Sequence, residues 1–110
     1  MSTLSTHVLD TAIGKPAAGI AIVLEHEEAN GWRRVGTDST NADGRAKGFA
    51  TAPLEAGNYR FTFDVAPYFS AQQQKCFFPT VQIAFTIDDE RHYHVPLLIS
   101  PYGYSTYRGS

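Results

Sequence analysis

The chain has 110 residues, a formal net charge of -2 and 43% hydrophobic residues, so it is too apolar for intrinsic disorder and long enough to bury one core without disulfides or metal. Its lysines and arginines are scattered, which excludes the basic stripe that binds nucleic acid, and no apolar stretch approaches the ~20 residues that cross a bilayer. We therefore expect one domain over residues 1–110, with no cofactor and with neither nucleic acid nor membrane as a partner.

Localisation signals are missing from the sequence as given. The single cysteine, Cys76, cannot form an intrachain disulfide, which agrees with a reducing compartment. Residues 1–10 lack the positive start and apolar run of a secretory signal. The final Arg108, Gly109 and Ser110 differ from a peroxisomal signal. We expect a soluble, cytoplasmic protein.

Apolar and polar residues alternate at every second position along much of the chain, which predicts strands. In chain order, the expected strands are 5–9, 20–25, 32–37, a short one near 46–49, 59–65, 81–87, 92–99 and 104–107. Turn-forming residues separate them, including a Gly-Lys-Pro turn at 14–16 and an Asn-Ala-Asp-Gly turn at 41–44. The sequence therefore predicts about eight short strands.

One segment, 66–74, breaks this alternation. Its small side chains and its three consecutive glutamines permit a short helix between two strands. Many short strands with frequent turns are typical of a sandwich or barrel, and strands of this length favour two packed sheets with Greek-key-like connections. The expected fold class is all-β: a two-sheet sandwich of about eight short strands with one short helix.

Two of the four histidines, His92 and His94, stand two positions apart on an expected strand, so both imidazoles point to the same face. With His7 they could give zinc three nitrogen ligands, but no acidic or cysteine pattern completes such a site, and we expect no metal. Imidazole also suits proton transfer at neutral pH without metal. His26 lies among glutamates near a turn, which favours a solvated surface.

Weaker signals come from His7, Arg45 and the C-terminal run. His7 shares a strand face with Ser5 and Leu9, and pattern alone favours a hydrogen-bonded histidine of an edge strand. Arg45 follows the turn at 41–44, from which a guanidinium could hold a planar carbonyl or an anion, although a solvated turn residue is the more common case. The run 100–110 is aromatic and polar without excess charge, so we expect it to dock onto the rest of the chain.

Four motifs stand out: LSTHVLD at 4–10, NADGR at 41–45, HYHVPLL at 92–98 and the terminal YRGS at 107–110. Together they resemble the 5-hydroxyisourate hydrolases, the enzyme branch of the transthyretin-like family, over nearly the whole chain. The resemblance implies a transthyretin-like β-sandwich that assembles as a homotetramer, a dimer of dimers with catalytic pockets at the dimer–dimer interface. It also implies hydrolysis of 5-hydroxyisourate in urate breakdown, by attack of water on the ring lactam carbonyl.

The resemblance also implies site residues. The catalytic positions that match are His7, Arg45, His94 and Ser110, and the substrate-binding positions are Tyr107, Arg108, Gly109 and His92. Transthyretin itself resembles 100–106 but lacks the YRGS ending and the histidine set. A non-catalytic carrier of small molecules with the same fold is therefore the alternative.

Overall fold

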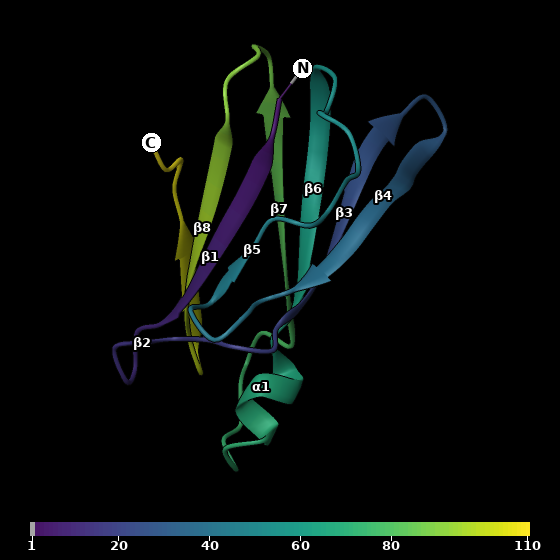
Figure 1. Ribbon diagram of the computed structural model, residues 1–110. Coiled ribbons are helices and arrows are strands. Elements are labelled where there is room, and N and C mark those ends of the chain that lie inside the picture. The colour runs from purple at the N-terminus through teal and green to yellow at the C-terminus, as the bar shows by residue number, and fades with distance from the viewer. Residues whose placement is uncertain (1) are drawn as a thin grey trace.

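The structure, a computed structural model, describes residues 2–110 and is built of strands with one short helix (Figure 1). The strands are β1 (Leu4–Asp10), β2 (Lys15–Pro16), β3 (Ala21–Glu28), β4 (Gly31–Ser39), β5 (Arg45–Ala46), β6 (Gly57–Asp64), β7 (Thr80–Ile87), β8 (Tyr93–Ser100) and β9 (Gly103–Thr106). The helix α1 (Ala66–Ser70) connects β6 to β7. No helix among residues 2–110 has the length and apolar character needed to cross a membrane.

Two sheets make up the fold. One has the order β2-β1-β8-β9, with β5 also paired to β1, and the other has the order β4-β3-β6-β7. The neighbours β1 and β8 run parallel although about 90 positions separate them in the sequence, because the chain visits the second sheet between them. The expected two-sheet, all-β sandwich with one short helix is confirmed.

The core lies between the sheets and takes alternate side chains from their inner faces. Phe61 and Phe63 on β6 are fully buried, and so is Leu97 on β8. The Phe61 ring lies 4.9 Å from that of Phe49 and 5.4 Å from that of Phe63, both in tilted arrangements that aromatic rings favour over face-to-face stacking. This packing holds the two sheets together, and the side chains of their outer faces take no part in it.

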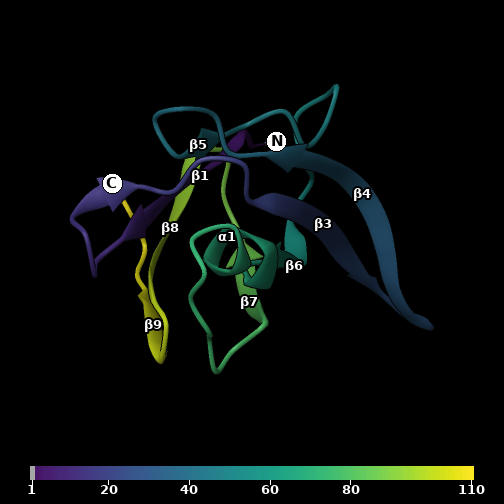
Figure 2. The same cartoon turned by 90° about the horizontal axis from the view of Figure 1, so that it is seen from below.

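The helix α1 covers one end of the sandwich, across the opening between the sheets (Figure 2). Buried Asp10, at the end of β1, accepts a 2.8 Å hydrogen bond from the Tyr68 hydroxyl of α1 and a 3.0 Å bond from the Ala12 amide. These bonds fix the end of β1 that lies near α1. Because β8 runs parallel to β1, the beginnings of both strands lie at the opposite end of the molecule.

Local predictions differ from the structure at three places. The turn expected at 14–16 contributes the short strand β2, which raises the count to nine named strands among residues 2–110. The strand expected near 46–49 is only β5, because the Asp38 carboxylate takes the amide hydrogens of Lys47 and Gly48 at 3.2 and 2.8 Å. The helix expected over 66–74 ends at Ser70, and Gln73 adopts a left-handed φ of 54° that no α-helix continues.

The expectation of a solvated His26 is wrong. Its side chain is only 13% exposed, and its ring lies 4.7 Å from that of Tyr59. The imidazole also makes a 3.2 Å hydrogen bond to the Glu28 carboxylate. Acidic neighbours in the sequence indicated solvent, but the pairing of β3 with β6 places His26 directly opposite Tyr59.

Candidate functional site on the outer face of the first sheet

The parallel pairing of β1 with β8 brings two predicted site residues to one surface. In this register Ser5 lies opposite His94, and His7 lies opposite Pro96. Ser5, His7 and His94 are half-buried, whereas the intervening Thr6 and Val95 are buried in the core. Since side chains alternate along a strand, the two imidazoles share the outer face of the sheet.

Arg45, the first residue of β5, joins them directly after the turn at 41–44. The Asn41 side chain accepts the amide hydrogens of Asp43 and Arg45 at 2.9 and 3.0 Å, which closes the turn. Gly44 has a φ of 74° and lies so close to β1 that an added Cβ would stand 2.5 Å from the Val8 carbonyl oxygen. The glycine thereby allows the turn to dock, and Arg45 becomes the direct cross-strand partner of His7.

The electrostatic environment of His94 favours its neutral form. Burial is the main cause that lowers the pKa of His94 below its ordinary value, and the neighbouring Arg45, His7 and His92 act in the same direction. A hydrogen bond involving the Ser5 backbone opposes this shift more weakly. The His94 imidazole is therefore unprotonated at neutral pH, the state that a general base requires.

Removing the charge of Arg45 is expected to raise the pKa of His94, because the protonated imidazole then no longer lies beside a guanidinium. In Arg45→Gln, the NMR titration midpoint of the His94 ring hydrogens should move to higher pH than in the wild type. The matched control is Arg33→Gln, which removes an equal charge from β4 of the other sheet and should leave the His94 midpoint in place. An unchanged or lower midpoint in Arg45→Gln would contradict this electrostatic account.

A continuous set of hydrogen bonds links His94 to His92. The Ser5 hydroxyl lies 2.8 Å from Nδ1 of His94 and 2.8 Å from Nε2 of His92. The other ring nitrogen of His92, Nδ1, lies 2.5 Å from the Thr3 hydroxyl. His92 comes just before β8 rather than within it, yet it shares the side of His94 as expected. Ser5 and Thr3 were missed as site residues because nothing in the sequence indicates that β1 and β8 are neighbours.

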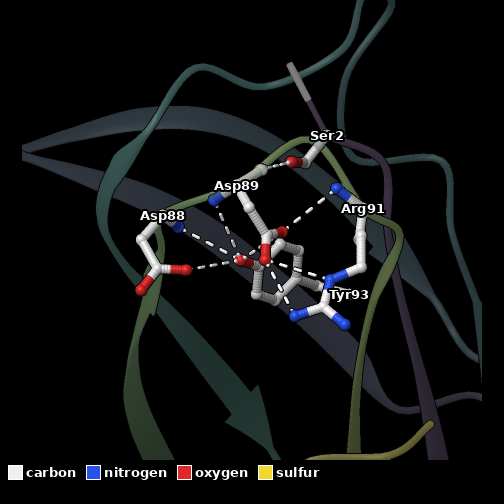
Figure 3. Close-up of polar contacts among 5 residues, drawn as sticks. All are labelled: Ser2, Asp88, Asp89, Arg91 and Tyr93. Atoms are coloured by element: carbon white, nitrogen blue, oxygen red, sulfur yellow. Dashed lines mark hydrogen bonds and ion pairs between the residues drawn. The ribbon is translucent and has the colours of Figure 1, made fainter.

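Tyr93, between the two histidines, holds the start of β8 in place (Figure 3). Its buried hydroxyl lies 2.8 Å from Oδ1 of Asp89 and 3.0 Å from Oδ1 of Asp88, and it accepts the amide hydrogens of both residues at 3.2 and 3.1 Å. Hydrogen bonds from Arg91 and Tyr93 lower the pKa of Asp89 to about 2, so this carboxylate stays ionised. The loop that connects β7 to β8 is thus fixed by one phenol group.

The C-terminal residues dock beside β8 as the sequence predicts. The Gly109 amide donates a 2.8 Å hydrogen bond to the His94 carbonyl, and the Arg108 guanidinium lies over the Tyr93 ring at 4.6 Å. In Figure 1 the chain end lies beside β8, away from α1. The Arg108 contact indicates that this residue anchors the chain end. Exposed Ser110 follows directly after the residue that pairs with His94.

Gly109 has a specific steric reason to be glycine. A Cβ at this position would stand 2.5 Å from Cδ2 of His94, whereas a Cβ at Gly103 would meet only the Ser100 hydroxyl at 3.8 Å. Gly109→Ala is therefore expected to displace the imidazole or the chain end and to lower kcat/KM about tenfold, less than the ~10²-fold that a ~1 Å misplacement can cost, because the terminal segment can shift. Gly103→Ala, the control, should keep wild-type turnover; equal kinetics for the two variants would show that close packing at Gly109 is unimportant.

Two hollows flank this cluster. Ser5, Arg45, Lys47 and His92 help line one of about 550 Å³. His94 lines another of about 310 Å³ together with Tyr107, Arg108 and residues of β7. Within residues 2–110, no three His, Cys, Asp or Glu side chains are arranged to hold a metal ion. Arg45, His92, His94, Tyr107 and Arg108 thus line two hollows near the beginning of β8, and Ser5 bonds to both His92 and His94.

Comparison with known proteins gives a consistent result. The profile of the HIUase/Transthyretin family matches residues 4–109. A 5-hydroxyisourate hydrolase of Mesorhizobium japonicum is 49% identical over 97% of this chain and 91% of its own length. The solved structure of Klebsiella pneumoniae 5-hydroxyisourate hydrolase superimposes with a TM-score of 0.89 at 43% identity, covering 100% of both chains.

The fold alone does not separate enzyme from carrier. Transthyretin from Sparus aurata superimposes equally well, with a TM-score of 0.90 at 30% identity, over 97% of this chain and 96% of that chain. On this fold the present chain carries the group formed by His7, Arg45 and His94 and the docked YRGS ending. With 106 of its 110 residues matched by the family profile, this chain belongs to the HIUase/Transthyretin family.

Proposed function

We propose that this protein hydrolyses 5-hydroxyisourate to 2-oxo-4-hydroxy-4-carboxy-5-ureidoimidazoline in urate breakdown. The observation that carries the proposal is the meeting of His7, Arg45 and His94 on one face of the sheet, each from a different strand. The name shared by the relatives of 40–49% identity supports the substrate. An enzyme for this substrate needs a base for water, a donor for the developing oxyanion and a clamp for a planar ring.

Each of the three groups has a chemical role in this proposal. Neutral His94 takes a proton from the attacking water, and His7 shares the proton transfers to and from the substrate. The Arg45 guanidinium holds the ring carbonyl oxygens, for which its planar array of donors is well suited. The water oxygen adds to the lactam carbonyl, the ring C–N bond opens and a proton returns to the departing nitrogen, so no covalent enzyme intermediate is required.

The chain end completes the proposed site. Ser110 hydrogen-bonds the water or the substrate, and Tyr107, Arg108 and Gly109 shape the pocket around it. Support comes from the pairing of Gly109 with His94 and from the hollow that Tyr107 and Arg108 share with that histidine. His92 lines the neighbouring hollow with Arg45.

A homotetramer built as a dimer of dimers is part of the proposal. Strands β7 and β9 lie at the edges of their sheets, where backbone groups can pair with another chain. The aromatic rings of Phe78 and Tyr104 form an edge-on pair near these strands, and both side chains are exposed. Analytical ultracentrifugation should give four times the subunit mass of 12.1 kDa. We place the protein in the cytoplasm because a free thiol such as Cys76 suits a reducing compartment.

Freshly made 5-hydroxyisourate provides the direct test of the activity. Its ultraviolet absorbance should decay faster with the purified protein than in a reaction without enzyme, in proportion to protein concentration. The same decay rate with and without protein would contradict hydrolysis and favour a non-catalytic carrier of small molecules. Retention of an unchanged ligand after gel filtration would support the carrier.

A further inference from the structure

Four side chains form an unbroken hydrogen-bonded line from the interior of the site to solvent. It runs from His94 through Ser5 and His92 to Thr3, with distances of 2.8, 2.8 and 2.5 Å. His94, at the inner end, is half-buried, whereas His92 and Thr3 are exposed. The line therefore connects a shielded imidazole to one that water can reach.

The Ser5 hydroxyl couples the tautomers of the two histidines along this line. A hydroxyl group has one hydrogen to donate, so Ser5 can donate to only one of its two imidazole partners. When Ser5 donates to Nε2 of His92, it accepts from Nδ1–H of His94. In neutral His94 the remaining nitrogen, Nε2, is then unprotonated and free to act as a base.

The surroundings of the two histidines also favour a positive charge on His92 over one on His94. A protonated His94 would be half-buried beside Arg45 and His7, on strand β8 between β1 and β9. A protonated His92 would face solvent, which stabilises a charge that burial penalises. The charged groups that line the hollow next to His92 are Asp38, Arg45 and Lys47, so one carboxylate there faces two cations.

We propose that Ser5 and His92 act as a proton relay for His94, an inference that rests on the proposed hydrolytic function. As water adds to the substrate carbonyl, its proton goes to Nε2 of His94. The Nδ1 proton of His94 passes to Oγ of Ser5, and the Ser5 proton passes to Nε2 of His92. The positive charge then resides on exposed His92 rather than on half-buried His94.

The second half of the reaction restores the relay. The Nε2 proton of His92 returns through Ser5 to Nδ1 of His94, while the Nε2 proton of His94 goes to the nitrogen that leaves the carbonyl carbon. Every proton is accounted for, and no oxidant, reductant or further reactant takes part. His92 thereby acts through His94, and Ser5 becomes a positioning residue.

Kinetics of matched variants test the relay. Ser5→Ala and His92→Gln are each expected to lower kcat about tenfold with little change in KM, a part of the ~10²–10⁴-fold that general acid–base catalysis contributes. Because both belong to one line, the double variant should be no slower than the slower single variant. Ser5→Thr, which keeps the hydroxyl, should retain most of the wild-type kcat. Ser70→Ala, a serine of exposed position in α1, is the control and should not differ from wild type.

Nitrogen-15 NMR of the histidine rings tests the same line without turnover. The wild type should show hydrogen on Nδ1 of His94, and Ser5→Ala should shift this hydrogen toward Nε2. Three results would each overturn the relay. They are a loss of kcat in the double variant equal to the product of the two single losses, a wild-type kcat for Ser5→Ala, and an unchanged His94 tautomer. A wild type without hydrolytic activity would refute the proposed function instead, and the tautomer measurement would still decide whether the hydrogen-bonded line exists.

Discussion

Replacement of His94 by asparagine is expected to lower kcat by about 10²-fold or more, the usual scale of general acid–base assistance. Asparagine is polar and smaller than histidine, but it cannot accept and return a proton near neutral pH. The half-buried position of His94 and the groups that keep it neutral both point to this residue as the base. Steady-state turnover of His94→Asn, followed by the loss of ultraviolet absorbance, measures the effect.

A histidine of the other sheet supplies the control for this variant. His26 packs on Tyr59 and forms a hydrogen bond to Glu28. Its strand, β3, belongs to the sheet that does not contain β1 and β8. His26→Asn, compared at equal amounts of folded protein, should keep the wild-type kcat. A near-normal rate for His94→Asn would remove His94 from the mechanism.

Deletion of residues 107–110 is expected to abolish turnover while leaving a folded protein. The deletion removes the hydrogen bond from Gly109 to the His94 carbonyl and the contact of Arg108 with the Tyr93 ring. Tyr107 and Arg108 are exposed, and the pairing of β9 with β8 ends at Thr106, so the core loses little. We expect a reduction of at least ~10²-fold, the scale on which misplaced catalytic groups lose rate.

Circular dichroism and sedimentation of the truncated protein separate loss of the site from loss of the fold. Both should match the wild type even though turnover is lost. Ser110→Ala tests the terminal hydroxyl by itself and should retain more activity than the deletion, because the Gly109 and Arg108 contacts remain. Wild-type turnover by the truncated protein would refute any role of the chain end.

Local patterns in the sequence were sufficient for most of the secondary structure. Alternation over 59–65 and 81–87 predicted β6 and β7 to within two residues at each end, since one face of each strand is buried and the other is not. Exceptions arose where a distant group decided the outcome. The Asp38 carboxylate ends β5 early by taking the amide hydrogens of Lys47 and Gly48.

Assembly of the candidate site depends on contacts that local patterns do not encode. Alternation placed Ser5 and His7 on one face and His92 with His94 on another strand, and both statements agree with the structure. The parallel pairing that puts Ser5 opposite His94 joins residues 89 positions apart. Only the family resemblance predicted that residues of these distant segments belong to one site, and it gave no role to Ser5.

The account depends most on a flat purine ring being bound between Arg45 and the two histidines. A crystal structure of the assembled protein soaked with urate, a purine close in shape to the substrate, tests this directly. We predict that the ring lies within hydrogen-bond distance of Arg45, with His7, His94 and the chain end at Ser110 around it. A ring bound elsewhere, with these four residues apart from it in every subunit, would contradict the account.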